Sequence, residues 1–254
     1  MITISIIIAT WNAEGSLRKC LDSIVPQLSP EVELLIIDGG STDSTLAIVE
    51  QYSQYISKSC SEKDKGIYDA WNKGVKIASG EWIMFVGADD ILLPDALPSY
   101  LNIIHTTDEI QSYDYICALN EHVDKNGKIL KIIGGAPKWS VYRRNMNAAH
   151  VASLHNKRNL FETIGYYDLQ FKICADYDLL LRKRDRLKWL FIPVHIARMQ
   201  VGGMSFSIKA IKETYHIRKK NKTVSRFEND ILFLFNILAY RCFIIKHKMK
   251  GEEI

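Results

Sequence analysis

Short apolar runs alternate with helically spaced segments along the first hundred residues. The runs are rich in β-branched residues, which favours buried strands, and the segments between them repeat apolar residues every three or four positions, which favours helices. We expect strands at 4–9, 32–37, 55–59 and 82–86, and helices at 14–24, 45–52, 67–78 and 97–104. This alternation predicts a mainly parallel, Rossmann-like α/β sheet flanked by helices, with its ligands at the carboxyl ends of the strands.

The pattern changes in the second part of the chain. Residues 113–119 and 129–133 flank an Asp-Lys-Asn-Gly turn and predict a hairpin, while residues 190–196 predict another short strand. A buried helix is expected at Tyr177–Leu181, and residues 200–205 contain two glycines typical of a flexible loop. The sheet is therefore expected to be mixed.

The composition of the chain fits one large domain, or a domain with an appendage. It has 254 residues, of which 47% are hydrophobic, so it can bury a substantial core. The net charge of +4 arises at the C-terminal end, where basic residues crowd the sequence from residue 208 onward. The apolar stretch 231–245 is shorter than a membrane span and is interrupted by Asn236 and Arg241, so we expect an amphipathic or buried helix there. Such a segment suits a solvated helix face, an anionic lipid surface or a phosphate-bearing ligand.

The cysteines and the N-terminus indicate a reducing, cytoplasmic environment. The five cysteines are scattered and lack CxxC spacing, which argues against a zinc site and against a disulfide framework. The first apolar run has no basic region before it, so no signal peptide is expected. No feature of the sequence indicates a nucleic-acid partner.

The stretch 80–94, GEWIMFVGADDILLP, is the first candidate site. A predicted buried strand ends at Gly87 and is followed by Asp89 and Asp90. Two adjacent acids repel each other, so they are either neutralised by a cation such as Mg²⁺ or Mn²⁺ or exposed in a solvated turn. The chain has neither a GxGxxG fingerprint nor a GxxxxGK[ST] loop, so phosphate must be held in another way.

Other polar residues follow the remaining strands. Asp38 ends the second strand and precedes two glycines that let the backbone approach a ligand closely. Asp176 and Asp178 begin a predicted helix, where acids usually act only as caps. His150 and His155 are five residues apart and do not share a helical face, so a structural role is the simpler interpretation for both.

Five segments in this order resemble the inverting glycosyltransferases of family 2. They read SIIIATWN, LLIIDGGSTDST, SEKDKGIYDAWNKG, ASGEWIMFVGADD and ADYDLLLR. The resemblance implies a GT-A type fold over residues 1–205, with a nucleotide-sugar half at 1–100 and an acceptor half at 101–205. The basic amphipathic helical extension at 206–254 lies outside it.

The resemblance also implies a role for each motif. Asp89 would hold Mg²⁺ or Mn²⁺ against the diphosphate, and Asp176 would take the proton from the acceptor hydroxyl. The nucleotide sugar would contact Ala9, Thr10, Asn12, Asp38, Asp64, Lys65, Gly66 and Asp90. A loop near the diphosphate and acceptor would include His150, His155, Gly202, Gly203 and Ser205.

The chain departs from the family pattern at two glycines. Gly87 occupies the first acidic position of the DxD element, so the resemblance does not imply the ribose contact that relatives make with an acid there. Gly39 stands where many relatives have a second acid near the base, which weakens the inference that the base is uracil. A UDP-sugar is the donor that the resemblance favours.

Three functions are weighed on these grounds. The first is a metal-dependent inverting glycosyltransferase of cell-surface polysaccharide biosynthesis, acting on a glycan or polyprenyl-linked acceptor at the cytoplasmic membrane face. The second is a sugar-phosphate nucleotidyltransferase, although ATWNAEGSLRK lacks the glycine-rich loop it needs. The third is a non-catalytic nucleotide-sugar-binding relative, against which the presence of Asp89 and Asp176 argues. The C-terminal segment could serve as a membrane contact or as a homodimer interface.

Overall fold

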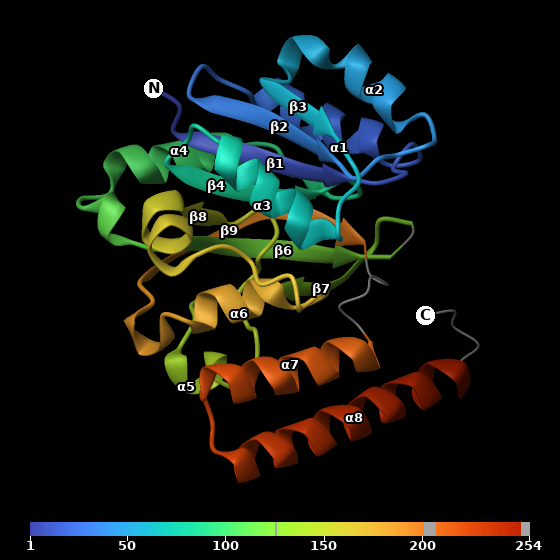
Figure 1. Ribbon diagram of the computed structural model, residues 1–254, viewed down its shortest axis with the longest axis vertical. Helices are drawn as coiled ribbons and strands as arrows, with labels where there is room; N and C mark the ends of the chain where they lie inside the picture. The colour runs from blue at the N-terminus through green and yellow to red at the C-terminus, as the bar shows by residue number, and fades with distance from the viewer. Residues whose placement is uncertain (125, 201–206, 250–254) are drawn as a thin grey trace.

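The computed structural model describes residues 1–124, 126–200 and 207–249 (Figure 1). The strands are β1 (Ile4–Thr10), β2 (Val32–Asp38), β3 (Lys58–Ser61), β4 (Trp82–Gly87), β5 (Ile91–Leu92), β6 (Tyr115–Val123), β7 (Ile129–Ile133), β8 (Leu154–Asn156) and β9 (Trp189–Gln200). The helices are α1 (Leu17–Ile24), α2 (Thr45–Gln51), α3 (Ile67–Ile77), α4 (Ala96–Thr106), α5 (Trp139–Tyr142), α6 (Ala175–Leu181), α7 (Ile208–Asn221) and α8 (Arg226–Met249).

All nine strands belong to one sheet. Its order is β3-β2-β1-β4-β8-β6-β9-β5, and β7 pairs with β6 at one end of that strand. The first four strands are parallel, as the alternation of strands and helices predicted. Strand β8 enters antiparallel between β4 and β6, and β6 and β9 run parallel, so the sheet is mixed as expected.

The sheet is covered on both faces because its central strands are apolar on both sides. In β1, Ile6 and Ile8 face one hydrophobic cluster and Ile7 faces the other. Helices α1, α2 and α4 cover the first face, and α3 and α6 cover the second. A fully buried parallel strand requires this arrangement, which explains why these strands lack a polar alternation.

The sequence expectations for the edge regions needed correction. The third strand begins at Lys58 rather than at 55, because Ser53–Tyr55 forms a 3-10 turn after α2. The last predicted strand extends over the whole of β9, which includes Gln200 from the expected glycine loop at 200–205, and residues 201–205 of that loop lie outside the described residues. The division of residues 1–205 at about residue 100 stays a prediction. Strand β5 from the first half pairs with β9 from the second, so the two halves share one sheet.

The C-terminal extension is a pair of helices, α7 and α8, packed below the sheet (Figure 1). Helix α7 is not a free surface helix, because Ile217 and Arg218 are fully buried and Ile217 belongs to the same hydrophobic cluster as α6. Of the helices in the described part of the chain, none combines the length and hydropathy needed to cross a membrane.

Candidate active site

The register of the parallel strands brings the predicted site residues to one edge of the sheet. Thr10 at the end of β1 is paired with Asp38 at the end of β2, and Ala9 is paired with Gly87 at the end of β4. Because these strands are parallel, the loops that follow them emerge side by side.

Asp38 organises the loop that follows β2. Its Oδ1 accepts hydrogen bonds from Thr10 Oγ1 at 2.8 Å and Ser41 Oγ at 2.5 Å. Its Oδ2 accepts from the backbone N–H groups of Gly40 and Ser41 and from Ser61 Oγ. Burial alone would raise the pKa of Asp38, but the hydrogen bonds from Ser41, Ser61 and Thr10 outweigh burial and lower it. Asp38 is thus a charged anchor within the protein, and a direct contact with a nucleotide stays a prediction.

The loop after β1 is tied to the loop after β2. The Asn12 N–H donates to Ser41 Oγ at 2.8 Å, and the Thr42 N–H donates to Asn12 Oδ1 at 2.9 Å. Asn12 has a φ of 47°, a left-handed conformation that asparagine tolerates better than most residues. Beside it, Trp11 is 70% exposed, so a large aromatic face is available at this edge. Trp11 was not among the individual residues predicted from the sequence, although an aromatic residue in a loop after a strand is typical of a nucleotide site.

Asp64 folds back toward the end of β2. Its Oδ1 accepts from the Gly66 N–H at 2.9 Å, and its Oδ2 lies where a side chain at Gly39 would begin. The Lys65 N–H donates to Asp69 Oδ2 at 3.0 Å, and the φ of 112° at Gly66 suits glycine alone. The loop 64–66 therefore lies beside Gly39 at the end of β2, and its contact with a nucleotide stays a prediction.

Asp89 and Asp90 both turn toward Gly87. A Cβ built on Gly87 would lie 2.6 Å from Asp90 Oδ2 and 2.9 Å from Asp89 Oδ1. The buried Asp90 carboxylate accepts the Gly87 N–H at 2.8 Å, whereas the side chain of Asp89 is exposed. Burial, reinforced by the charge of Asp89, raises the pKa of Asp90 to about 8.

These two carboxylates fit a hard divalent cation. The absence of a side chain at Gly87 lets one oxygen of each acid approach the backbone at the end of β4. No group of three His, Cys, Asp or Glu side chains suited to a metal occurs among the residues that the structure describes. Mg²⁺ is commonly bound by one or two carboxylates plus substrate phosphates and water, so a two-carboxylate site is chemically sufficient when a diphosphate is present.

Asp176 lies in the first turn of α6. Its Oδ1 is 3.0 Å from the hydroxyl of Tyr68 on α3, and the same hydroxyl is 2.7 Å from the carbonyl oxygen of Ile173. Burial raises the pKa of Asp176 to about 6, partly offset by hydrogen bonds from the Tyr177 N–H and from Tyr68. A carboxylate with this pKa is ionised at neutral pH and can still accept a proton, as a general base requires.

Asp176 borders two hollows. A cleft of about 630 Å³ lies between α3, the β6–β7 hairpin and the segment before β8, and its walls include Trp71, Ile132, Met146 and His150. A smaller cavity of about 270 Å³ lies on the other side, between α6 and the helices α7 and α8. The larger cleft has the size of a small-molecule site and begins at Ile67, next to the loop 64–66.

The two histidines are joined to each other. His155 Nε2 lies 3.1 Å from His150 Nδ1, and His150 Nε2 lies 3.2 Å from the hydroxyl of Tyr167. Both rings are buried against Phe85, and burial lowers the pKa of each; that of His150 falls to about 3. They are therefore neutral, and only His150 reaches the wall of the larger cleft. A part for either of them in acceptor or diphosphate binding stays a prediction.

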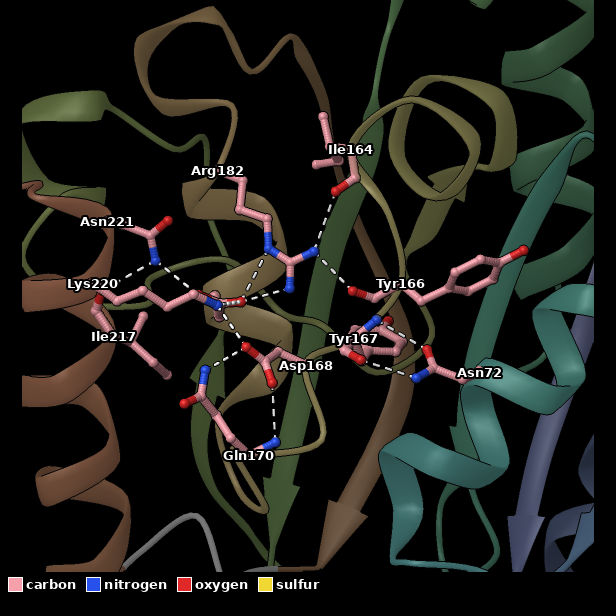
Figure 2. A network of polar contacts seen from close by, with 11 residues as sticks. Asn72, Ile164, Tyr166, Tyr167, Asp168, Gln170, Arg182, Ile217, Lys220 and Asn221 are labelled. Carbon is pink, nitrogen blue, oxygen red and sulfur yellow. Dashed lines mark hydrogen bonds and ion pairs between the residues drawn. The ribbon is translucent and has the colours of Figure 1, made fainter.

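Asp178, two residues after Asp176 and thus on the other side of α6, is fully buried among Arg182, Lys220 and Asn221, which Figure 2 labels. It accepts from the guanidinium of Arg182 at 2.6 and 3.0 Å, from Lys220 Nζ at 2.9 Å and from Asn221 Nδ2 at 2.8 Å. Since Lys220 and Asn221 belong to α7, the C-terminal extension contributes directly to the helix that carries Asp176. The sequence offered no signal for this contact beyond the density of basic residues in α7.

The comparison with known proteins identifies the family. Residues 5–165 match the profile described as Glycosyl transferase family 2, so the chain belongs to this family of glycosyltransferases. It is 35% identical over 213 residues to a PGL/p-HBAD biosynthesis glycosyltransferase of Mycobacterium bovis, an alignment that covers 80% of this chain and 79% of the relative.

Solved structures agree on the fold. The chain resembles Staphylococcus aureus TarS 1–349 in complex with UDP-GlcNAc, with a TM-score of 0.64 and 17% identity over 93% of this chain and 72% of the other. It also resembles the mannosyltransferase PcManGT of Pyrobaculum calidifontis in complex with GDP-Man and Mn²⁺, with a TM-score of 0.64 and 15% identity over 98% and 76% of the two chains. The GT-A type fold expected from the sequence is thereby confirmed.

Proposed function

We propose that the protein transfers a sugar from a nucleotide-diphosphate sugar to an acceptor hydroxyl with inversion at the anomeric carbon. The observation that carries this proposal is the arrangement of carboxylates at one edge of the sheet. Asp89 and Asp90 follow β4, and Asp176 lies on the wall of a cleft that begins beside the nucleotide loops. A cation held at the strand ends and a base on the wall of a neighbouring cleft are the two groups that a displacement at the anomeric carbon requires.

Asp89, assisted by Asp90, would hold Mg²⁺ or Mn²⁺. When bound, such a cation stabilises the negative charge that develops on the leaving diphosphate, an effect of several kcal/mol. Gly87 supports this role because a side chain there would collide with both carboxylates and displace them.

Asp176 would act as the general base. An alcohol is a poor nucleophile at neutral pH, and a positioned carboxylate that removes its proton contributes on the order of 10² to 10⁴ in rate. Tyr68 holds Oδ1 of the carboxylate, and Asp176 lines the larger cleft, where an acceptor would lie. Attack from the side opposite the leaving diphosphate would invert the configuration.

The donor we favour is a UDP-sugar, in line with the TarS complex with UDP-GlcNAc. The base and ribose would lie over the loops that carry Ala9, Thr10, Asn12 and 64–66. Trp11 would stack on the base, because it offers the one large exposed aromatic face described in this region of the site.

The acceptor we favour has an apolar part, such as a lipid-linked glycan. The walls of the larger cleft are mainly apolar, and the rim strand β7 exposes Ile129, Leu130 and Ile132 by 45%, 56% and 47%. Exposed aliphatic residues on an edge strand favour contact with an apolar ligand. A role in cell-surface polysaccharide or glycolipid synthesis accords with the name of the mycobacterial relative.

Helix α8 would attach the enzyme to the cytoplasmic face of a membrane. One side of this helix exposes Phe227, Ile231, Leu234, Phe235 and Leu238, each by about half or more. Their spacing places them in one stripe, and the sequence of α7 and of residues 241–250 is rich in basic residues. An apolar stripe in a basic segment is typical of a helix that lies in a lipid interface. A homodimer through the same stripe is the alternative.

Release of nucleoside diphosphate tests the proposal. UDP-, GDP- and dTDP-sugars should be compared with Mn²⁺, with Mg²⁺ and with chelator, for the parent protein and for Asp89→Asn and Asp176→Asn. We expect chelator-sensitive release from one donor, lost in both variants, and an inverted anomer in the product. Release of pyrophosphate from nucleoside triphosphates would instead indicate a nucleotidyltransferase. Metal-dependent nucleotide binding without any release would indicate a non-catalytic relative.

A further inference from the structure

Glu213 of α7 holds the backbone immediately before the helix of Asp176. Its Oε1 accepts the Lys172 N–H at 2.8 Å, and its Oε2 accepts the N–H groups of Ile173 at 2.8 Å and Cys174 at 3.0 Å. One carboxylate therefore receives three consecutive amide protons from a segment about 40 residues earlier in the chain. Hydrogen bonds to a charged acceptor are the stronger kind, so the path of this segment is fixed.

The same segment is held from the opposite side by Tyr68. The hydroxyl of Tyr68 lies 2.7 Å from the carbonyl oxygen of Ile173 and 3.0 Å from Asp176 Oδ1. The single proton of this hydroxyl is shared between the two oxygens, so the peptide of Ile173 is held at its N–H by α7 and at its carbonyl by α3. Asp176 is three residues further on, so its orientation depends on both anchors.

A second link between α7 and α6 lies on the far side of the helix. Asp178 accepts from Lys220 and Asn221, and Lys220 also contacts Asp168 Oδ2 at 2.8 Å (Figure 2). Asp178 also accepts from Arg182, whose guanidinium donates to the carbonyl oxygens of residues 164 and 166. Helix α6 consequently cannot rotate without breaking bonds to α7 at both points.

We propose that Glu213 is a positioning residue for the base: through the three amides of 172–174 it sets the orientation and the electrostatic surroundings of Asp176. This inference rests on the proposed role of Asp176 in glycosyl transfer. It assigns to the C-terminal extension a part in the active site that neither the family match, which ends at residue 165, nor the motifs of the sequence indicate.

The charges around Asp176 make the proposal measurable. Burial keeps several groups near it neutral by raising their pKa values, namely the phenols of Tyr68, Tyr115, Tyr142, Tyr167 and Tyr177 and the thiol of Cys174. The other titratable groups that the described residues place around it are Glu213 from α7, Lys172 from the preceding segment, and His122, Lys131 and the neutral His150 on the walls of the larger cleft. The negative charge of Glu213 raises the pKa of Asp176, whereas the hydrogen bond from Tyr68 lowers it.

The test measures nucleoside diphosphate release with water as acceptor, using the donor that the parent protein turns over. Glu213→Gln keeps the size of the side chain and removes the charge, and Glu213→Asp keeps the charge and shortens the reach. We expect kcat to fall about 10- to 100-fold in both, as misplacement of a catalytic group by about 1 Å produces. The KM for the donor should stay within about twofold, since neither change touches the nucleotide loops.

The pH profile separates positioning from a purely structural role. In Glu213→Gln the acid limb of kcat should move to lower pH, because a charge that disfavours ionised Asp176 is gone. In Tyr68→Phe the limb should move to higher pH, because a hydrogen bond to the ionised form is gone. In Glu213→Asp the limb should stay in place while kcat falls.

Glu228→Gln is the matched control. Glu228 is also in the extension, but it contacts Arg143 and Arg144 rather than the segment before α6. Its removal should leave kcat and the acid limb unchanged. Parent kcat and an unshifted limb in Glu213→Gln would overturn the inference; if that variant does not fold, parent kcat in Glu213→Asp would do so. A parent protein that releases no diphosphate from any donor would overturn the proposed function itself.

Discussion

Gly39 leaves the space that the carboxylate of Asp64 occupies. A Cβ at Gly39 would lie 2.6 Å from Asp64 Oδ2, closer than real contacts allow. The glycine that departs from the family pattern is thus explained by the neighbouring loop, since an acid at 39 would both collide with Asp64 and repel it. The two positions act as one unit, in which the carboxylate of Asp64 takes the space that a side chain at 39 would need.

Gly39→Ala should therefore displace Asp64 and release the hydrogen bond to Gly66 that shapes the loop 64–66. We expect the Kd of the nucleotide to rise about tenfold, the equivalent of one lost hydrogen bond of about 1.4 kcal/mol. Titration of UDP by calorimetry measures it, and Gly15→Ala is the control because nothing lies within 4 Å of that position. In an Asp64→Ala background the added effect of Gly39→Ala should nearly vanish; full additivity would contradict the coupling.

Asp89→Asn should weaken the metal-dependent part of donor binding. Replacing a carboxylate by an amide removes the charge that a divalent cation requires, so added Mn²⁺ should no longer tighten the binding of UDP. The measurement is the nucleotide Kd with Mn²⁺ and with chelator. Asp95→Asn is the control, because Asp95 is exposed close by and its left-handed φ of 64° suits asparagine. If Mn²⁺ still tightens UDP binding in Asp89→Asn, Asp89 is not a ligand of the metal.

Asp176 should make turnover rise with pH through about 6, since the base acts only when ionised. The same raised pKa has the opposite effect on stability. The folded protein disfavours the charge, so the stabilisation that the neutral carboxyl gives is complete below the unfolded pKa and is lost as pH rises through about 6. Asp176→Asn should accordingly abolish turnover and raise the melting temperature more at about pH 8 than at about pH 4. A stabilisation that does not vary with pH would contradict the raised pKa.

Asp178→Asn should cost about 3 kcal/mol in the free energy of unfolding, because Arg182 and Lys220 lose a fully buried partner. Urea denaturation measures the change. Asp168→Asn is the control, since Asp168 contacts the same Lys220 at a partly exposed position and its loss should cost about 1 kcal/mol or less. Equal costs for the two substitutions would show that burial of Asp178 does not matter.

The apolar stripe of α8 should bind lipid. Vesicles containing phosphatidylglycerol should co-sediment with the parent protein at low salt, and substitution of Ile231, Leu234 and Leu238 by serine should weaken this about tenfold or more. Serine at the exposed Leu46 and Val194, which are on other surfaces, should have no effect. If the triple variant instead changes the molecular mass in solution and leaves vesicle binding intact, the stripe is a dimer interface.

The sequence predicted the fold best where runs of apolar residues recur along the chain. Strands β1, β2 and β4 are continuous apolar runs because both faces of the sheet are covered, and the register of these strands follows from their parallel order. Strand β8 was missed because three residues carry no periodicity, and its antiparallel insertion depends on long-range packing. The pairing of His150 with His155 was likewise invisible, since the turn between them sets their approach.

The contacts of the extension could not be read from its composition. Basic residues in α7 suggested a surface, yet Lys220 neutralises a buried acid and Arg218 is itself fully buried. Charge density alone does not distinguish a solvated lysine from one that reaches inward along an apolar stem. Glu213 was the sole acid in this basic segment, and that was the single available hint of its role.

The attachment of α7 to α6 also bears on how the enzyme is made. During synthesis the N-terminal part of a chain folds first, and the strands from β1 to β9 are complete before α7 leaves the ribosome. Until residues 213–221 arrive, the amides of 172–174 lack the acceptor they have in the finished protein, and Asp178 lacks Lys220 and Asn221. The loops after β1 and β2 can therefore form early, whereas the position of Asp176 is fixed only when the last quarter of the chain has been made. We therefore expect a chain that ends before α7 to form the loops after β1 and β2 and to lack the ordered surroundings of Asp176.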